Sequence, residues 1–208
     1  YNVLKPTYTG TYNTDTNSES GQTKGFLGSA SSTKAKVKTI QRQNIDSVTL
    51  KNSVSDAVAD TTWDVSARGD NSILAWYTTN ANGSLKVYIG SNSEIFANQD
   101  STNLFAYIGY AEICTSTDTI NNLNLLNVTS VTKMYRMFRY TGYRSMTKLE
   151  LGNGFNTSNV EDMSGMFEQT GYKAMTTLNL GGNFITNHVT DMSYMFSDCG
   201  HDKLGSLD

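Results

Sequence analysis

All eight methionines of this 208-residue chain lie between residues 134 and 195, and they form evenly spaced columns. A step of 29 residues relates the members of each column: Met134, Met163 and Met192; Met137, Met166 and Met195; Met146 and Met175. A repeat period of roughly 20 to 50 residues is typical of stacked units that bury a shared core. The C-terminal part of the chain is therefore predicted to be a stack of repeats.

Each repeat shows the pattern of one strand followed by one short helix. In residues 148–151 the leucines alternate with charged residues, which predicts a strand with one apolar face. Val160, Met163 and Phe167 have the i, i+3, i+7 spacing of one helix face. Ser158 and Glu161 have capping-box spacing at the start of this segment, and Gly171 suits a left-handed C-cap at its end. We predict an α+β fold: a right-handed, leucine-rich-repeat-like solenoid with a strand, a turn and a short helix per coil.

The predicted organisation has three parts. Residues 1–34, rich in Thr, Ser, Asn and Gly, are predicted to be a linker or a loosely ordered lead-in. Residues 35–118 form a β-rich cap domain, and residues 119–208 form the repeat solenoid. The copies span residues 120–146, 147–175 and 176–204, and a fourth begins at 205–208. Because the ends of a stack must be covered, further repeats or a cap are expected after Asp208.

Short alternating segments define the cap domain. The predicted strands are residues 37–40, 45–50, 73–77, 85–89 and 94–96. Residues 80–83, Asn-Ala-Asn-Gly, predict a hairpin turn, because Asn and Gly tolerate positive φ. The candidates for the core of this domain are Trp63, Trp76, Phe96 and Phe105.

The repeat unit carries a family resemblance. Residues 149–167 read L-x-L-G-x-x-F-x-T-S-x-V-x-D-M-S-x-M-F, and this unit resembles the surface-protein repeats of the BspA-like leucine-rich-repeat family. Residues 63–66, 69–70 and 75–76, with 88–90 and 104–105, are similar to the cap region that often precedes those repeats. The resemblance implies a secreted or surface-anchored protein of host-associated bacteria or related microbes, with adhesion to host or matrix proteins in some members. The period of 29 is longer than is usual in that family.

The predicted function is a non-enzymatic, cell-surface or secreted protein-binding or adhesion module. The alternatives are a structural spacer or stalk in a larger surface protein and, third, a fragment of a glycan-active enzyme. A net charge of −3 leaves no electrostatic footprint for nucleic acid, and no apolar run is long enough for a membrane span. The expected partner is a host or matrix protein or another cell-surface component, and no cofactor or metal is predicted. His188 and His201 occupy repeat columns that other residue types also fill.

Three groups of residues are candidates for binding. The residues that flank the core leucines of the strands should line an exposed sheet face: Asn122, Asn124, Lys148, Glu150, Thr177 and Asn179. A basic and aromatic patch in the first repeat has the composition enriched at protein interfaces: Lys133, Tyr135, Arg136, Arg139, Tyr140, Tyr143 and Arg144. The triplet Arg68, Gly69 and Asp70 is an integrin-type motif, for which a chance occurrence beside a turn is the alternative.

Three further patterns favour structural roles. The Met-x-x-Met pairs could bind Cu(I), but each is followed by phenylalanine, and core packing is favoured. Asp15, Asn17 and Glu19 resemble the start of a calcium loop whose glycine and closing glutamate are out of place. Cys114 and Cys199 are predicted to be free thiols, because Cys114 precedes the first coil and Cys199 falls in the third, too far apart for a disulfide.

Overall fold

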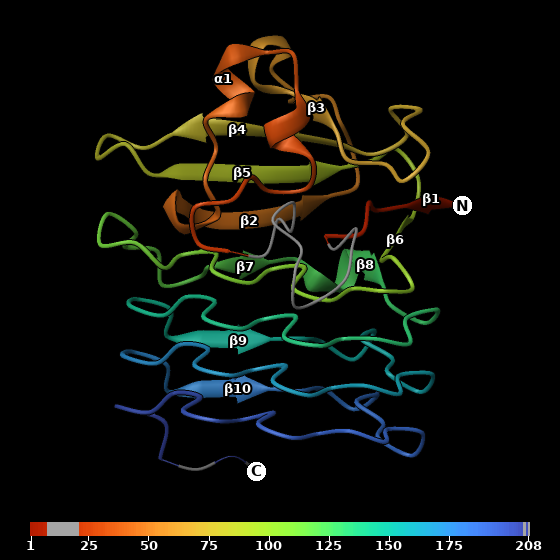
Figure 1. Ribbon diagram of the computed structural model, residues 1–208, viewed down its shortest axis with the longest axis vertical. Helices are drawn as coiled ribbons and strands as arrows, with labels where there is room; N and C mark the ends of the chain where they lie inside the picture. The colour runs from red at the N-terminus through yellow and green to blue at the C-terminus, as the bar shows by residue number, and fades with distance from the viewer. Residues whose placement is uncertain (8–20, 206, 208) are drawn as a thin grey trace.

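The computed structural model describes residues 1–7, 21–205 and 207, and it forms layers along one long axis (Figure 1). The candidate calcium loop at residues 15–19 lies outside the described residues. The largest sheet has five strands, in the order β3 (Trp63–Asp64), β4 (Leu74–Thr79), β5 (Leu85–Gly90), β2 (Ile45–Lys51) and β7 (Ile120–Asn121). A three-stranded sheet contains β1 (Asn2–Val3), β6 (Ile95–Phe96) and β8 (Leu126–Asn127), and a two-stranded sheet contains β9 (Lys148–Glu150) and β10 (Thr177–Asn179).

The hairpin predicted at residues 80–83 is confirmed. Strands β4 and β5 pair antiparallel on either side of it, and β2 lies parallel to both β5 and β7. Trp63, Trp76 and Phe105 are buried as predicted, while Phe96 is half-buried. Strand β7 belongs to the repeats, so the sheet runs across the predicted boundary at residues 118–119, and one hydrophobic cluster spans both parts.

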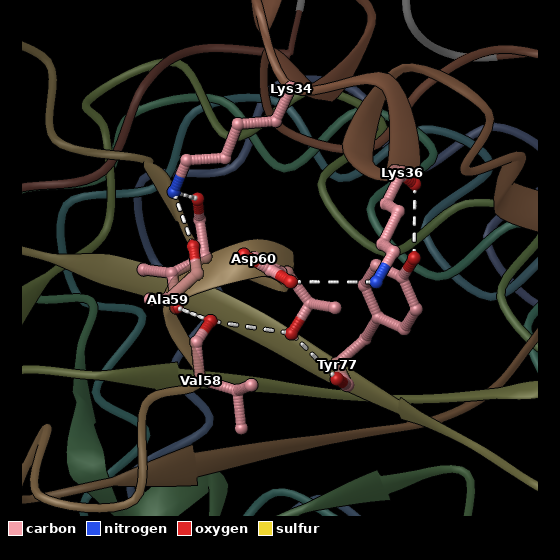
Figure 2. A network of polar contacts seen from close by, with 8 residues as sticks. Lys34, Lys36, Val58, Ala59, Asp60 and Tyr77 are labelled. Carbon is pink, nitrogen blue, oxygen red and sulfur yellow. Dashed lines mark hydrogen bonds and ion pairs between the residues drawn. The ribbon is translucent and has the colours of Figure 1, made fainter.

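The strand predicted at residues 37–40 is wrong, because this segment forms the helix α1 (Ala35–Lys38). Val37 and Ile40 are the buried residues, and their i, i+3 spacing suits one helical turn better than a strand. Figure 2 shows how the turn is held against the sheet: Lys34 Nζ donates to the Ala59 carbonyl at 2.6 Å, and the Tyr77 hydroxyl donates to the Lys36 carbonyl at 3.0 Å.

Short 3₁₀ turns connect the remaining elements. They are η1 (Ser29–Ser31), η2 (Arg42–Asn44), η3 (Ala59–Thr61) and η4 (Leu123–Leu125). The described parts of the predicted lead-in pack into the molecule: β1 pairs with β6, and Leu4, Phe26 and Leu27 are fully buried. The predicted lead-in thus contributes Leu4, Phe26 and Leu27 to the core, while several of its other described residues are exposed.

The predicted fold class, a strand-turn-helix leucine-rich-repeat solenoid, is wrong. The chain is a sheet-dominated mixed fold, and residues 119–205, all of which are described, contain no α-helix. The segments expected to be helices are runs of tight turns at residues 134–142, 163–171 and 192–200, which we call turn stretches. Each repeat that contains one is called a coil below. Gly171 has the left-handed φ of +57° expected for a C-cap, but no helix precedes it.

The destination of the backbone N–H groups explains why turns replace the helix. In an α-helix each N–H after the first turn donates to a carbonyl of the same segment. In residues 163–171, alternate N–H groups instead donate to the next coil, as from Met163 to the Asp191 carbonyl and from Phe167 to the Met195 carbonyl. The N–H groups between them close i+3 turns, such as Met166 to Met163. Stacking between coils therefore takes half of the bonds that a helix would need.

An additional turn stretch at residues 100–109 lies in the region predicted to be a cap. The N–H groups of Ser101, Asn103, Phe105 and Tyr107 donate to the first coil at 2.8–2.9 Å. Its left-handed residues match those of the coils column by column: Asn103 with Arg136, Gly165 and Tyr194; Tyr107 with Tyr140, Gln169 and Asp198; Gly109 with Gly142, Gly171 and Gly200. Four turn stretches are therefore stacked, one more than the methionines mark.

The methionine columns form the core of this stack, as predicted for all but one member. Seven of the eight methionines are buried, and Met192 in the last coil is the exception, at 48% exposed. Phenylalanines form a second column in which Phe105, Phe138, Phe167 and Phe196 stack with ring centroids 5.5 Å apart at each step. The coils thus repeat the same packing.

A column of buried threonine hydroxyls predicts a stabilising substitution. Thr141 and Thr170 donate to the carbonyls of Phe105 and Phe138 at 2.7 and 2.6 Å, and Cys199 occupies the same column. Cys199→Thr should add the missing bond to the Phe167 carbonyl and raise the free energy of unfolding by about 1 kcal/mol, measured by urea denaturation. Cys199→Val, which has the same shape without the hydroxyl, is the control. Equal stability of the two variants would contradict the predicted bond.

Candidate functional site

The residues predicted to line the strand face lie together on one exposed surface. Lys148 pairs in register with Thr177, and Glu150 with Asn179, and all four side chains are exposed. Asn122 and Asn124 adjoin them around a cleft of about 330 Å³ that also contains Lys148 and Glu150. Lys148 Nζ lies 3.7 Å from a Glu150 carboxylate oxygen, so the two charges on this face are paired with each other.

A larger cleft adjoins this face, and sequence analysis did not identify it. It measures about 560 Å³ and is lined by residues from several elements, among them Lys51, Asn52, Asn92, Glu94, Asn124 and Asn127. The Asn127 amide donates to a Glu94 carboxylate oxygen at 2.7 Å across its wall. These residues lie in separate segments between Lys51 and Asn127, nearly the length of the cap domain apart, so no local pattern marks them.

The basic and aromatic patch is also brought together, but its charges are largely paired. Glu168 of the second coil lies 3.4 Å from Arg136 Nε and 3.0 Å from Arg139 Nε. The Arg136 guanidinium lies 4.8 Å from the centroid of the Tyr135 ring, and that of Arg139 lies 4.7 Å from Tyr140. Lys133 is exposed in the bridge column between Asp100 and Asp162. The patch is therefore a fixed array of arginines and tyrosines.

Arg144 and Tyr143 belong to the same array. Arg144 Nε donates to the Tyr110 carbonyl at 3.2 Å, and its Nη2 lies 3.4 Å from Glu112. Burial, followed by the neighbouring rings of Tyr172 and Tyr110, raises the pKa of Tyr143 above its usual value. The phenol therefore stays neutral and able to donate a hydrogen bond well into the alkaline range.

The tyrosines of the patch continue into neighbouring coils as a ladder. Tyr107 stacks on Tyr140 at 4.8 Å, and Tyr143 stacks on Tyr172 at 4.9 Å. Tyr110 contacts both Tyr140 and Tyr143, which joins the two stacks. We call these five tyrosines the tyrosine ladder. Sequence analysis missed Tyr107, Tyr110 and Tyr172, although the Gly-Tyr pairs at residues 109–110, 142–143 and 171–172 stand in register.

The two charged residues of the integrin-type triplet are paired with each other. Gly69 has a left-handed φ of +69°, and Arg68 Nη2 lies 2.8 Å from Asp70 Oδ2. Ser72, through its side chain and its backbone N–H, lowers the pKa of Asp70 to about 2, and Arg68 adds to this effect. A partner that binds the charges of both Arg68 and Asp70 would first have to break this ion pair. The triplet stays a prediction, with less geometric support than the other two candidates.

The remaining reactive side chains include two cysteines and two histidines. Both cysteines are free, and burial raises the pKa of each thiol to about 12, so neither is a thiolate at neutral pH. His201 stacks on Tyr172 and contacts Asp202, whereas His188 Nδ1 donates a hydrogen bond to the Ser158 carbonyl at 2.7 Å. Among the described residues, no three His, Cys, Asp or Glu side chains group as metal ligands would.

Within the residues that the structure describes, no helix has the length and apolar character that crossing a bilayer demands. Residues 111–203 match the family model described as "Mycoplasma protein of unknown function, DUF285", a segment that covers the repeats and less than half of the chain. No curated protein and no solved structure matches the chain. The repeats are thus similar to those of a surface-associated bacterial family of unknown function, while membership of the BspA-like family stays a prediction.

Proposed function

We propose that this protein is a non-enzymatic binding module of the bacterial cell surface, and that the tyrosine ladder with Arg136 and Arg139 contacts a protein partner. The observation that carries the proposal is the backbone conformation of Tyr107 and Tyr140, whose φ angles are +63° and +58°. Bulky residues are rare in this left-handed region, which favours Gly, Asn and Asp. The same column holds Gln169 and Asp198 in later coils, so the coil does not require an aromatic residue there.

A residue kept in a disfavoured conformation is a reason to look for a functional role. Tyrosine and arginine are the residue types that most often dominate the energy of protein interfaces. Ring stacking and the ion pairs with Glu168 hold these side chains in place before binding, so less conformational entropy is lost on association. The strand face, by contrast, consists of exposed Asn, Thr and one self-paired Lys148–Glu150 couple.

The test replaces Tyr107 and Tyr140 with asparagine, which fits a left-handed backbone. The double variant Tyr107→Asn/Tyr140→Asn should keep its free energy of unfolding within about 1 kcal/mol, because relief of backbone strain offsets the lost stacking. Its binding to matrix proteins and host cells that retain the wild type should fall at least tenfold. Both quantities are measured on the same preparations, by urea denaturation and by surface plasmon resonance or bead adhesion.

Lys148→Ser/Glu150→Ser on the strand face is the matched control and should bind like the wild type. Loss of binding in this control, with binding retained by the tyrosine variant, would move the site to the strand face. If the wild type binds no host cell and no matrix or surface protein of the panel, the spacer alternative replaces the proposal. The spacer alternative also expects every one of these variants to be neutral.

A further inference from the structure

The carboxyl ends of three parallel strands meet at the larger cleft, whose volume is about 560 Å³. Strands β5 and β7 lie on either side of β2 and parallel to it, so the chain leaves all three strands at the same edge of the sheet (Figure 1). Asn92 follows β5, Asn52 follows β2 and Asn124 follows β7, and all three line the cleft. Ligands often bind outside the carboxyl ends of parallel strands, so this position is typical of a binding site.

Two segments that cross each other fix one wall of this cleft. The chain that leaves β2 passes so close to the end of β5 that a Cβ atom on Gly90 would lie 2.5 Å from the Ser53 carbonyl oxygen. The Val54 N–H donates to Asn92 Oδ1 at 3.3 Å, which joins the same two segments beside the cleft. Contacts between the two segments therefore hold this wall, and only glycine fits at residue 90 without displacing it.

The cleft combines an apolar floor with a polar rim. Ile95 of β6 and Leu126 of β8 pair in register, are each 2% exposed and form the floor. Asn52 and Asn124 are exposed on the rim, and their side chains form no hydrogen bond with any residue that the structure describes. Each of these two amides can therefore offer a donor and an acceptor to a ligand.

The carboxylate of Glu94 is oriented by its neighbours. Asn127 Nδ2 donates to Glu94 Oε1 at 2.7 Å, and Asn127 Oδ1 accepts the Thr129 N–H at 3.0 Å and the Thr129 hydroxyl at 2.6 Å. In the described part of the chain, Glu94 has no basic partner and its Oε2 atom accepts no hydrogen bond. This oxygen is thus a fixed acceptor for a ligand.

The second charged side chain of the lining, Lys51, is already paired. It forms an ion pair with Asp56, and its Nζ lies 5.4 Å from the centroid of the Tyr88 ring and 5.9 Å from that of the Trp76 ring. An anion would therefore meet the Glu94 carboxylate and a lysine whose charge is compensated. A calcium ion would find one carboxylate in the lining, fewer than its tight sites supply. The charges of the cleft favour an uncharged ligand.

We propose that this cleft binds an uncharged saccharide. A sugar ring has an apolar C–H face and hydroxyl groups around its edge, which matches the apolar floor and the polar rim. Glu94 Oε2 accepts a hydrogen bond from one hydroxyl, and the amides of Asn52 and Asn124 pair with others. The volume lies within the range of about 300–1,000 Å³ that is typical of small-ligand sites. The site is separate from the tyrosine ladder and does not depend on the function assigned to it.

The test begins with the intact protein on an array of neutral, sialylated and sulfated oligosaccharides. We expect binding to neutral members of the array. The neutral oligosaccharide that binds best is then titrated into the ¹⁵N-labelled protein, and the side-chain amide signals of Asn52, Asn92 and Asn124 should shift with one common Kd. Asn52→Ala/Asn124→Ala should weaken this binding at least tenfold and leave the free energy of unfolding unchanged, because these amides support no contact within the protein.

Glu94→Gln tests the oriented carboxylate. Its side-chain oxygen can still accept the Asn127 bond, but an NH₂ group replaces Oε2, so binding of the same oligosaccharide should weaken at least tenfold. Glu112→Gln removes an exposed carboxylate outside the cleft and is the matched control, which should bind like the wild type. The tyrosine variant Tyr107→Asn/Tyr140→Asn should also keep saccharide binding, so failure of either proposed site can be recognised separately.

Three results would overturn the proposal. The first is an array on which no neutral oligosaccharide binds, or on which only the sialylated or sulfated ones do. The second is a bound neutral oligosaccharide that leaves the amide signals of Asn52, Asn92 and Asn124 in place, or that Glu94→Gln binds as tightly as the wild type. The third is a shift of the same signals by Ca²⁺ alone that Glu94→Gln abolishes, since this would assign the cleft to a metal ion.

Discussion

Phe167→Ala should lower the free energy of unfolding by about 3–5 kcal/mol, the range for removing a fully buried aromatic side chain. The Phe167 ring is fully buried and stacks between Phe138 and Phe196, with centroids 5.5 Å away on each side. The cavity left by alanine would interrupt the phenylalanine column between two coils. Urea denaturation followed by circular dichroism measures the change.

Phe196→Ala is the matched control, because it removes the same side chain from the same column in the last coil. Phe196 is 36% exposed and stacks on one ring only, so its loss should cost about 1–2 kcal/mol. Similar costs for the two variants would show that the last coil is as well covered as the one before it. That result would contradict the difference in packing between the two coils.

Arg42→Met should destabilise the protein by about 3–5 kcal/mol, although methionine fills a similar volume. Arg42 is fully buried, and its guanidinium donates to the carbonyls of Asn103, Leu104 and Ala106 and lies 5.1 Å from the Phe26 ring. Methionine offers no donor, so these three carbonyls would stay buried without the bonds from the guanidinium. Thermal and urea unfolding both report the loss.

The variant Arg42→Lys tests how much of the stability depends on the charge of Arg42 and how much on the planar shape of its guanidinium. A lysine ammonium keeps the charge, but it lacks the planar fork that reaches several carbonyls at once. Its cost should therefore lie between those of the wild type and Arg42→Met. A cost below about 1 kcal/mol for Arg42→Met would mean that water or a backbone shift satisfies the carbonyls in place of the guanidinium.

Much of the packing followed from residue spacing. The period of 29 placed the methionines, valines and phenylalanines in columns, and the structure buries those columns in all coils but the last. The turn at residues 80–83 also followed from its Asn and Gly residues, because turn conformation depends on local φ preferences. The missed turn stretch, with the residue after it, carries the same Asp, Phe, Gly and Tyr positions at residues 100–110 as residues 162–172, but it lacks methionine.

The candidate surfaces were predicted in part. Alternation along the strands identified Lys148, Glu150, Thr177 and Asn179, because the exposed face of a strand has a period of two. The partners of the arginines were not predictable, since Glu168 reaches Arg136 and Arg139 only when two coils stack. Arg42 is buried because its guanidinium donates to carbonyls about 60 residues away in the chain, and no local sequence pattern predicts this.

The sequence by itself determined the repeat, its period and the residues that face the core, because these depend on side-chain polarity and spacing. The tertiary structure alone decided whether residues 163–171 form a helix or a row of turns. The same i, i+3, i+7 spacing buries Val160, Met163 and Phe167 in either case. The choice depends on where the backbone N–H groups find acceptors, and here those acceptors belong to the next coil.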